Sequence, residues 1–158
     1  LGGGAILDIG CYPVSFSILV ASLISKIDFN KIEVLNKKKE IGPTGVDMNS
    51  FAELNFGNNF KSKVFASLIK NLGKKTRIIG TKGELILENT WTPTNSSSII
   101  ITGENEEKIK VKCHNNIYAY EINILSNCIL ENKKEPEFPG MTLAETLENM
   151  KILDKWLN

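Results

Sequence analysis

The sequence predicts an α+β fold: an open, largely antiparallel sheet with helices on one face. Apolar residues recur at helical spacing near the start of the chain and twice near its end. Between these segments, short runs with strand chemistry are separated by glycine-containing turns. Consecutive strands joined by short turns pair antiparallel, and the flanking helices bury their apolar residues against the sheet.

The first element is a mostly buried helix over residues 4–24, because its apolar residues recur on more than one side. Pro13 interrupts this helix. Proline has no N–H to offer the carbonyl of Ile9, and its ring pushes the backbone away. We therefore expect a kink or a restart of the helix near Tyr12.

Seven strands follow the first helix. Alternation is clearest where Ala52, Leu54 and Phe56 lie between polar residues. Turn residues at 57–59 and 80–83 predict two hairpins. The strands are expected at residues 31–36, 50–56, 61–69, 76–79, 84–88, 97–102 and 108–113.

The sheet face away from the helices also carries apolar side chains. Neighbouring residues such as Val64 and Phe65 place apolar groups on both faces. We expect a second copy of the chain to cover this open face, which makes the protein a homo-oligomer. The alternative is a solvated face that carries Lys61, Lys63, Lys108 and Lys110.

Two helices close the chain. The first, over residues 118–131, places Ile122, Leu125 and Ile129 on one face. The second begins with Thr142, and Glu145 three residues later predicts a capping box. The stripe that we expect this last helix to bury consists of Leu143, Leu147, Met150, Leu153 and Leu157.

Composition and charge narrow the function classes. The 158 residues are 42% apolar, which is enough for one core. With 19 Lys and Arg against 18 Asp and Glu, the net charge of +1 gives no field to attract nucleic acid or a membrane surface. The apolar stretch at 14–24 is too short to span a bilayer. We therefore expect neither nucleic acid nor a membrane as partner.

The three cysteines, Cys11, Cys113 and Cys128, show no CxxC spacing, and His114 is the single histidine. These residues support neither a disulfide framework nor a metal site. A reducing cytoplasm is the expected compartment. Cys11 is interpreted as a small apolar residue, and His114 either as a surface group or as a residue that reaches the substrate pocket.

The stretch GGGAILDIGCYPV follows Leu1. It is not a dinucleotide fingerprint, because Leu7 stands where GxGxxG requires its last glycine and no strand precedes it. Asp8 and Tyr12 are four residues apart and share one helix face. A tyrosine hydroxyl can exchange a proton with a carbonyl or alcohol, and a carboxylate can hold a substrate hydroxyl. The other reading of this pair is purely structural.

Five segments in order resemble the C-terminal domain of the glucose-fructose oxidoreductase and inositol dehydrogenase (GFO/IDH/MocA) family. They span nearly the whole chain. The first resembles the family's DxGxH or DxGxY helix, and its tyrosine is typical of the branch with dihydrodiol and D-xylose dehydrogenases. The segments are GGGAILDIGCYPV, GVDMNSFAELNF, IIGTKGELILENTWTPT, YAYEINILSNCILENKKEPEF and MTLAETLENMKILDKW.

The resemblance implies roles for three residues. Tyr12 is the expected catalytic proton donor or acceptor, and Asp8 is expected to bind substrate and assist. Trp91 would form a wall of the substrate pocket, the alternative being a loop aromatic packed on the sheet. The family's N-terminal Rossmann domain, which binds NAD or NADP and supplies a catalytic lysine, is absent from these residues. Residues 1–158 are thus expected to be a single substrate-binding and dimerisation domain, a fragment of a longer protein that is inactive alone.

The sequence is compatible with two functions. The first is the substrate domain of an NAD(P)-dependent oxidoreductase that acts on a sugar, a related polyol or a dihydrodiol. The second is a non-catalytic scaffold of the same fold that binds a ligand or self-associates. Retention of both Asp8 and Tyr12 favours the enzyme, because a scaffold has no need of that pair.

Overall fold

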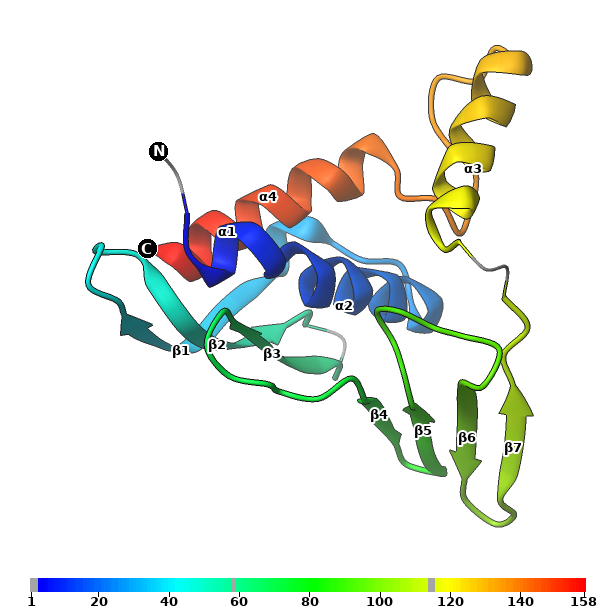
Figure 1. Ribbon diagram of the computed structural model, residues 1–158, viewed down its shortest axis with the longest axis horizontal. Coiled ribbons are helices and arrows are strands. Elements are labelled where there is room, and N and C mark those ends of the chain that lie inside the picture. The colour runs from blue at the N-terminus through cyan, green and yellow to red at the C-terminus, as the bar shows by residue number, and fades with distance from the viewer. Residues whose placement is uncertain (1–2, 58, 114–115) are drawn as a thin grey trace. The chain divides into compact units, whose positions relative to one another are not determined.

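The computed structural model describes residues 3–57, 59–113 and 116–158 (Figure 1). They form two compact units: Leu1–Leu72 together with Met141–Asn158, and Gly73–Gly140. The helices are α1 (Ala5–Ile9), α2 (Cys11–Ile24), the short 3-10 helix η1 (Phe29–Lys31), α3 (Tyr118–Leu130) and α4 (Leu143–Leu157). The strands are β1 (Glu33–Ile41), β2 (Asp47–Asn55), β3 (Lys61–Ser67), β4 (Thr76–Gly80), β5 (Gly83–Leu87), β6 (Ser98–Thr102) and β7 (Glu107–Lys110).

The first unit is a three-stranded sheet with helices on one side. Its strands are ordered β1-β2-β3 and pair antiparallel, and α1, α2 and α4 lie together against one face (Figure 1). The predicted hairpin between β2 and β3 is confirmed by their pairing, and Asn58 in its turn lies outside the described residues. This layer of helices on a sheet is the α+β arrangement that the sequence predicts.

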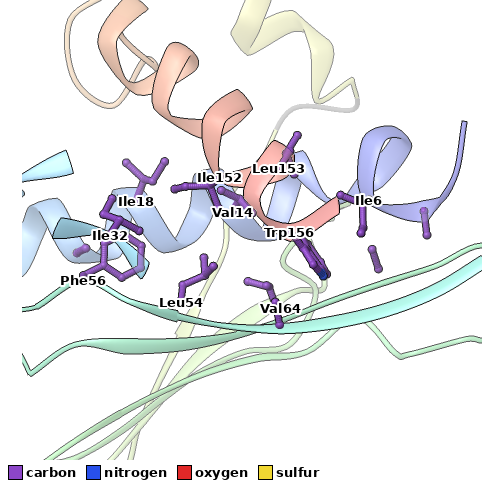
Figure 2. Packing of buried hydrophobic residues seen from close by; sticks show 14 residues of the cluster. Ile6, Val14, Ile18, Ile32, Leu54, Phe56, Val64, Ile152, Leu153 and Trp156 are labelled. Carbon is purple, nitrogen blue, oxygen red and sulfur yellow. The ribbon is translucent and has the colours of Figure 1, made fainter. Parts of the chain in front are cut away.

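The core of the first unit lies between these helices and the sheet (Figure 2). Strand β2 contributes Leu54 and β3 contributes Val64, both fully buried, while α4 contributes Trp156. The apolar residues that surround them come from α1, α2 and the segment before β1: Ile6, Val14, Ile18, Ala21 and Ile32.

Helix α4 has the predicted start but buries a different face. The backbone N–H of Glu145 donates to Thr142 Oγ1 at 3.2 Å, and the N–H of Thr142 donates to Glu145 Oε2 at 2.8 Å, so the capping box is confirmed. The predicted stripe is wrong for Leu143, Leu147 and Met150, which are exposed. The buried positions are Glu148, Asn149, Ile152, Leu153 and Trp156. They follow helical spacing, but the stripe begins with polar residues that a search for apolar periodicity passes over.

The second unit is a four-stranded antiparallel sheet, ordered β4-β5-β6-β7, followed by α3. The hairpin predicted at 80–83 joins β4 to β5, and Arg77 donates to the Glu84 carboxylate across this pair. That hydrogen bond lowers the pKa of the Glu84 carboxyl. The predicted apolar face of α3 is exposed, as Ile122, Leu125 and Ile129 show.

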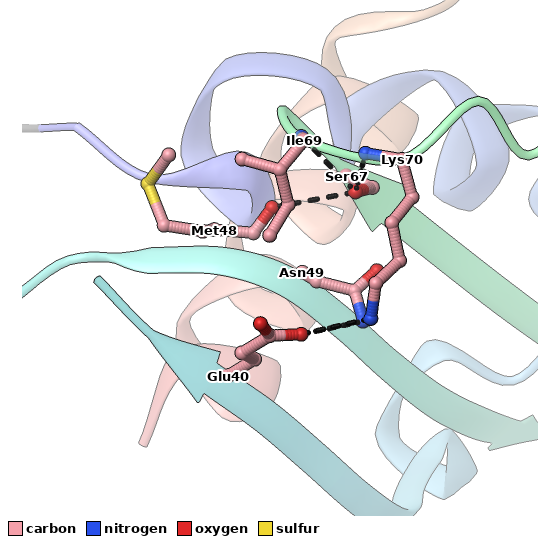
Figure 3. Close-up of polar contacts among 6 residues, drawn as sticks. All are labelled: Glu40, Met48, Asn49, Ser67, Ile69 and Lys70. Carbon is pink, nitrogen blue, oxygen red and sulfur yellow. Dashed lines mark hydrogen bonds and ion pairs between the residues drawn. The ribbon is translucent and has the colours of Figure 1, made fainter.

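The seven predicted strands are all present, but they form two sheets instead of one. The side chain of Ser67 ends β3, because its Oγ accepts hydrogen bonds from the backbone N–H groups of Ile69 and Lys70 (Figure 3). Lys70 then pairs with Glu40 of β1 at 2.8 Å, and this contact lowers the pKa of the Glu40 carboxyl. The chain thus leaves the first ladder before β4 begins. In the part of the chain that is described, no helix is long and apolar enough to cross a membrane.

Trp156→Ala is expected to lower the free energy of unfolding by about 3 to 5 kcal/mol, because it removes a fully buried side chain and leaves a cavity. Urea unfolding of the chain measures this loss. The matched control is Leu147→Ala on the same helix, where the side chain is 58% exposed, and a change within about 0.5 kcal/mol is expected. Equal losses at the two positions would contradict the assignment of the buried face.

Candidate functional site

Asp8 and Tyr12 flank the break between α1 and α2, and residues 8–12 are called the junction segment from here on. Both side chains are exposed, Tyr12 by 57%. Gly10, midway between them, is buried. The junction segment therefore offers a carboxylate and a phenol to solvent above a backbone that is packed against the core.

The break lies at Gly10, two residues before the predicted position near Tyr12. Pro13 falls in the first turn of α2, where a missing N–H costs no helix hydrogen bond, so a restart just before it is the favourable solution. The Gly10 N–H donates to the carbonyls of both Ala5 and Ile6, at 3.1 and 3.0 Å. A Cβ at Gly10 would lie 2.4 Å from the Ile6 carbonyl oxygen, so the turn requires glycine.

Asp47, at the start of β2, holds the beginning of α1. Its Oδ2 accepts the backbone N–H of Ile6 at 2.9 Å and the hydroxyl of Ser50 at 2.7 Å. Gly4 packs directly against this carboxylate, since a Cβ there would lie 2.1 Å from Asp47 Oδ1. The sequence identified this segment only as the entry to a sheet, and the role of Asp47 was missed.

Strand alternation is the reason why Asp47 escaped prediction. Ser50, Ala52 and Leu54 face the helices, and alternation would place Asp47 on the opposite face. The register shift between Glu40 and Ile41 leaves Met48 as an extra residue in β2, a β-bulge that turns Asp47 toward α1. A bulge of this kind has no reliable sequence signal.

Asn149 of α4 holds the other end of the junction segment. Its Nδ2 donates to the carbonyl oxygen of Cys11 at 3.0 Å, and the side chain is buried. Cys11 itself is half-buried and packs against the core, as a small apolar residue does. Asn149 was not among the predicted site residues either, because a polar residue inside a helix is usually solvated.

The glycine-rich start does not fit the phosphates of a dinucleotide. Gly4 faces the side chain of Asp47, an acidic residue next to which a pyrophosphate is disfavoured. Helix α1 has only five residues, so its N-terminus has little helix dipole to attract a phosphate. Gly2 lies outside the described residues. Within the described ranges, no group of three or more His, Cys, Asp or Glu side chains is placed to hold a metal ion.

Trp91 belongs to the second unit, in the loop between β5 and β6, and is 38% exposed. Asn89 and Thr92 shape its turn, because the Asn89 amide donates to the Thr92 carbonyl at 2.5 Å and the Thr92 hydroxyl donates to Asn89 Oδ1 at 3.1 Å. The neighbouring Thr90 bonds to Thr76 of β4 at 2.8 Å. The indole is thus carried by a loop tied to its own sheet. His114, the other candidate beyond the first unit, lies outside the described residues.

The family described as GFO/IDH/MocA C-terminal domain matches residues 1–86. Among curated proteins, trans-1,2-dihydrobenzene-1,2-diol dehydrogenase of Xenopus tropicalis is 30% identical over 99% of this chain and 47% of its own length. The human protein of the same name is 29% identical over 94% of this chain and 46% of its own. The chain thus spans about half the length of the curated relatives it matches.

Solved structures share the fold at low identity. A 3-ketoreductase from Actinomadura kijaniata, in complex with TDP-benzene and NADP, matches with a TM-score of 0.76 and 20% identity over 98% of this chain and 46% of its own. An aldose-aldose oxidoreductase from Caulobacter crescentus matches with a TM-score of 0.72 and 16% identity, over 98% of this chain and 44% of its own.

Gly4→Ala is expected to destabilise the chain more than Gly45→Ala. Both glycines have positive φ, +98° and +80°, and Gly4, with a ψ of 159°, lies in a region that is essentially limited to glycine, so alanine costs about 1 to 3 kcal/mol of backbone strain there. Only at Gly4 would the new methyl group also collide with Asp47, which adds at least about 1 kcal/mol. Urea unfolding measures both, and equal losses would show that Gly4 does not abut the carboxylate.

Proposed function

We propose, from the premise that this chain belongs to the GFO/IDH/MocA family, that it is the substrate-binding domain of an NAD(P)-dependent oxidoreductase. The proposal rests on one observation. Asp8 and Tyr12 expose their side chains, while buried side chains from β2 and α4 hydrogen-bond to the backbone beside them. Catalysis requires reacting groups that are both accessible and held in place, and the junction segment meets both conditions.

The proposed chemistry takes place at a carbon that bears oxygen. Tyr12 exchanges a proton with the substrate oxygen as the carbon changes between alcohol and carbonyl. Asp8 accepts a hydrogen bond from a neighbouring substrate hydroxyl and so fixes which carbon faces the tyrosine. Hydride exchange at that carbon is the chemistry that a nicotinamide supplies. Because the glycine-rich start does not fit dinucleotide phosphates, we propose that NAD or NADP is held by a part of the whole protein outside these residues.

The proposed substrate is a sugar, a related polyol or a dihydrodiol. Each carries adjacent hydroxyl groups, which a carboxylate and a phenol four residues apart on the junction segment can engage together. Trp91 is proposed as a substrate-binding residue, because an indole packs well against the apolar face of a ring. The relatives are consistent with this class, since they include a dihydrodiol dehydrogenase and an aldose-aldose oxidoreductase.

We also propose that the protein is a cytoplasmic homo-oligomer. The three thiols are free, as a reducing compartment requires. On the β1-β2-β3 face away from the helices, Leu35 and Phe65 are exposed, and the Phe65 ring lies 4.8 Å from that of Phe51. An apolar cluster on an open sheet face is suited to pairing with the same face of a second copy.

Tyr12→Phe is expected to lower turnover by the whole protein at least about 100-fold, because the proton can no longer be exchanged. Reduction of NAD and NADP is followed with aldoses, inositols and trans-dihydrodiols as substrates. The control is Tyr118→Phe on α3, another exposed tyrosine, for which no change is expected. Unchanged turnover in the Tyr12 variant would refute the assignment, and a whole protein that binds no cofactor would favour the scaffold.

Phe65→Glu is expected to shift the protein toward monomer, because it places a charge in the proposed interface, where the native side chain is 52% exposed. Light scattering of the chain at several concentrations measures its mass. Leu147→Glu, which alters an exposed apolar residue on α4, is the control and should leave the mass unchanged. A native chain that is monomeric at every concentration would contradict the proposed oligomer.

A further inference from the structure

We infer that Asp47 and Asn149 are positioning residues for the proposed catalytic pair, an inference that rests on the proposed function. Both are polar, and both are almost completely buried, with 2% and 5% of their surface exposed. They come from segments about a hundred residues apart in the sequence, β2 and α4. Their side chains nevertheless bond to backbone atoms on either side of Gly10, at Ile6 and Cys11.

Asp47 restrains the backbone that precedes Asp8. Its Oδ2 accepts the N–H of Ile6, two residues before Asp8, and is itself fixed by the hydroxyl of Ser50. The first turn of α1 continues this restraint, because the Asp8 N–H donates to the carbonyl of Gly4 at 3.1 Å. Gly4 in turn packs against the Asp47 carboxylate. The backbone that carries Asp8 is therefore bonded to the sheet through one buried side chain.

Asn149 restrains the backbone that precedes Tyr12. Its amide donates to the carbonyl of Cys11, the residue directly before the tyrosine. One turn later on α4, Ile152 and Leu153 are fully buried in the core, so the helix that carries the amide is itself held firmly. The two restraints thus act before and after Gly10, the residue at which the helix breaks.

The two side chains are poor choices for stability alone. In the described part of the chain, Asp47 Oδ1 and Asn149 Oδ1 are both buried without a hydrogen-bond partner. An unsatisfied buried oxygen destabilises a fold. These two groups bond the backbone at Ile6 and at Cys11, on either side of Gly10, which points to a role in holding the backbone that carries Asp8 and Tyr12. Displacement of a reacting group by about 1 Å can lower a rate about 100-fold, so the restraint matters for turnover.

Asn149→Leu in the whole protein separates positioning from stability. Leucine matches the size of asparagine but cannot bond the Cys11 carbonyl. We expect kcat to fall at least about tenfold while the KM for the cofactor and the melting temperature change little. Asp47 also satisfies the Ile6 N–H and the Ser50 hydroxyl, so its test variant is Asp47→Asn, which keeps an acceptor oxygen for these groups. We expect kcat to fall in this variant while the melting temperature changes little. Ser62→Ala, which removes a 2.7 Å contact with Ser17 of α2 away from the junction segment, should leave kcat unchanged.

Repeating the Asn149 variant in the Tyr12→Phe background and the Asp47 variant in the Asp8→Asn background identifies the residue through which each acts. We expect each to lower the remaining rate less than about twofold there, because the group that it positions has already been removed. The same fall as in the native background, or a variant that loses its fold instead of its rate, would make these residues structural and overturn the inference. If Tyr12→Phe alone leaves turnover unchanged, the proposed function fails. If it abolishes turnover while the Asn149 and Asp47 variants remain active, only the positioning role fails.

Discussion

The buried carboxylate of Asp47 is the contact on which the arrangement of the first unit depends. It joins the start of β2 to the first turn of α1 through the Ile6 N–H, and it leaves room for no side chain at Gly4. Helix α1 has only five residues, too few to be stable by itself, so this bond and the burial of Ile6 fix its direction. Because α2 begins directly after α1, the direction of α1 also sets where the junction segment lies and how α2 enters the core that it shares with α4.

Sequence patterns predicted where the helices and strands lie better than they predicted how these elements pack. Alternation located β2 and β3, the Thr142 to Glu145 spacing located the start of α4, and Pro13 predicted the break in the first helix within two residues. These signals are local, because a cap, a proline or an alternating strand acts through its neighbours in the chain. The same reasoning named Asp8 and Tyr12, which the structure places on one exposed segment.

Long-range features escaped prediction for physical reasons. The Met48 bulge changes which face Asp47 occupies, and it depends on the register with β1. The buried stripe of α4 runs through Asn149, whose burial is explained only by the Cys11 carbonyl it meets. The last four strands form a sheet of their own, and no local pattern in the sequence indicates where the first sheet ends. In the first two cases the deciding partner is distant in sequence or competes with a regular ladder.

A structure of the whole protein with NAD or NADP and a substrate analogue tests the central claim most directly, that the junction segment is the reacting surface. The account predicts that Tyr12 Oη lies about 2.6 to 3.2 Å from the reacting oxygen of the analogue, with Asp8 accepting from an adjacent hydroxyl. An analogue bound away from α1 and α2, with Tyr12 out of reach, would contradict it.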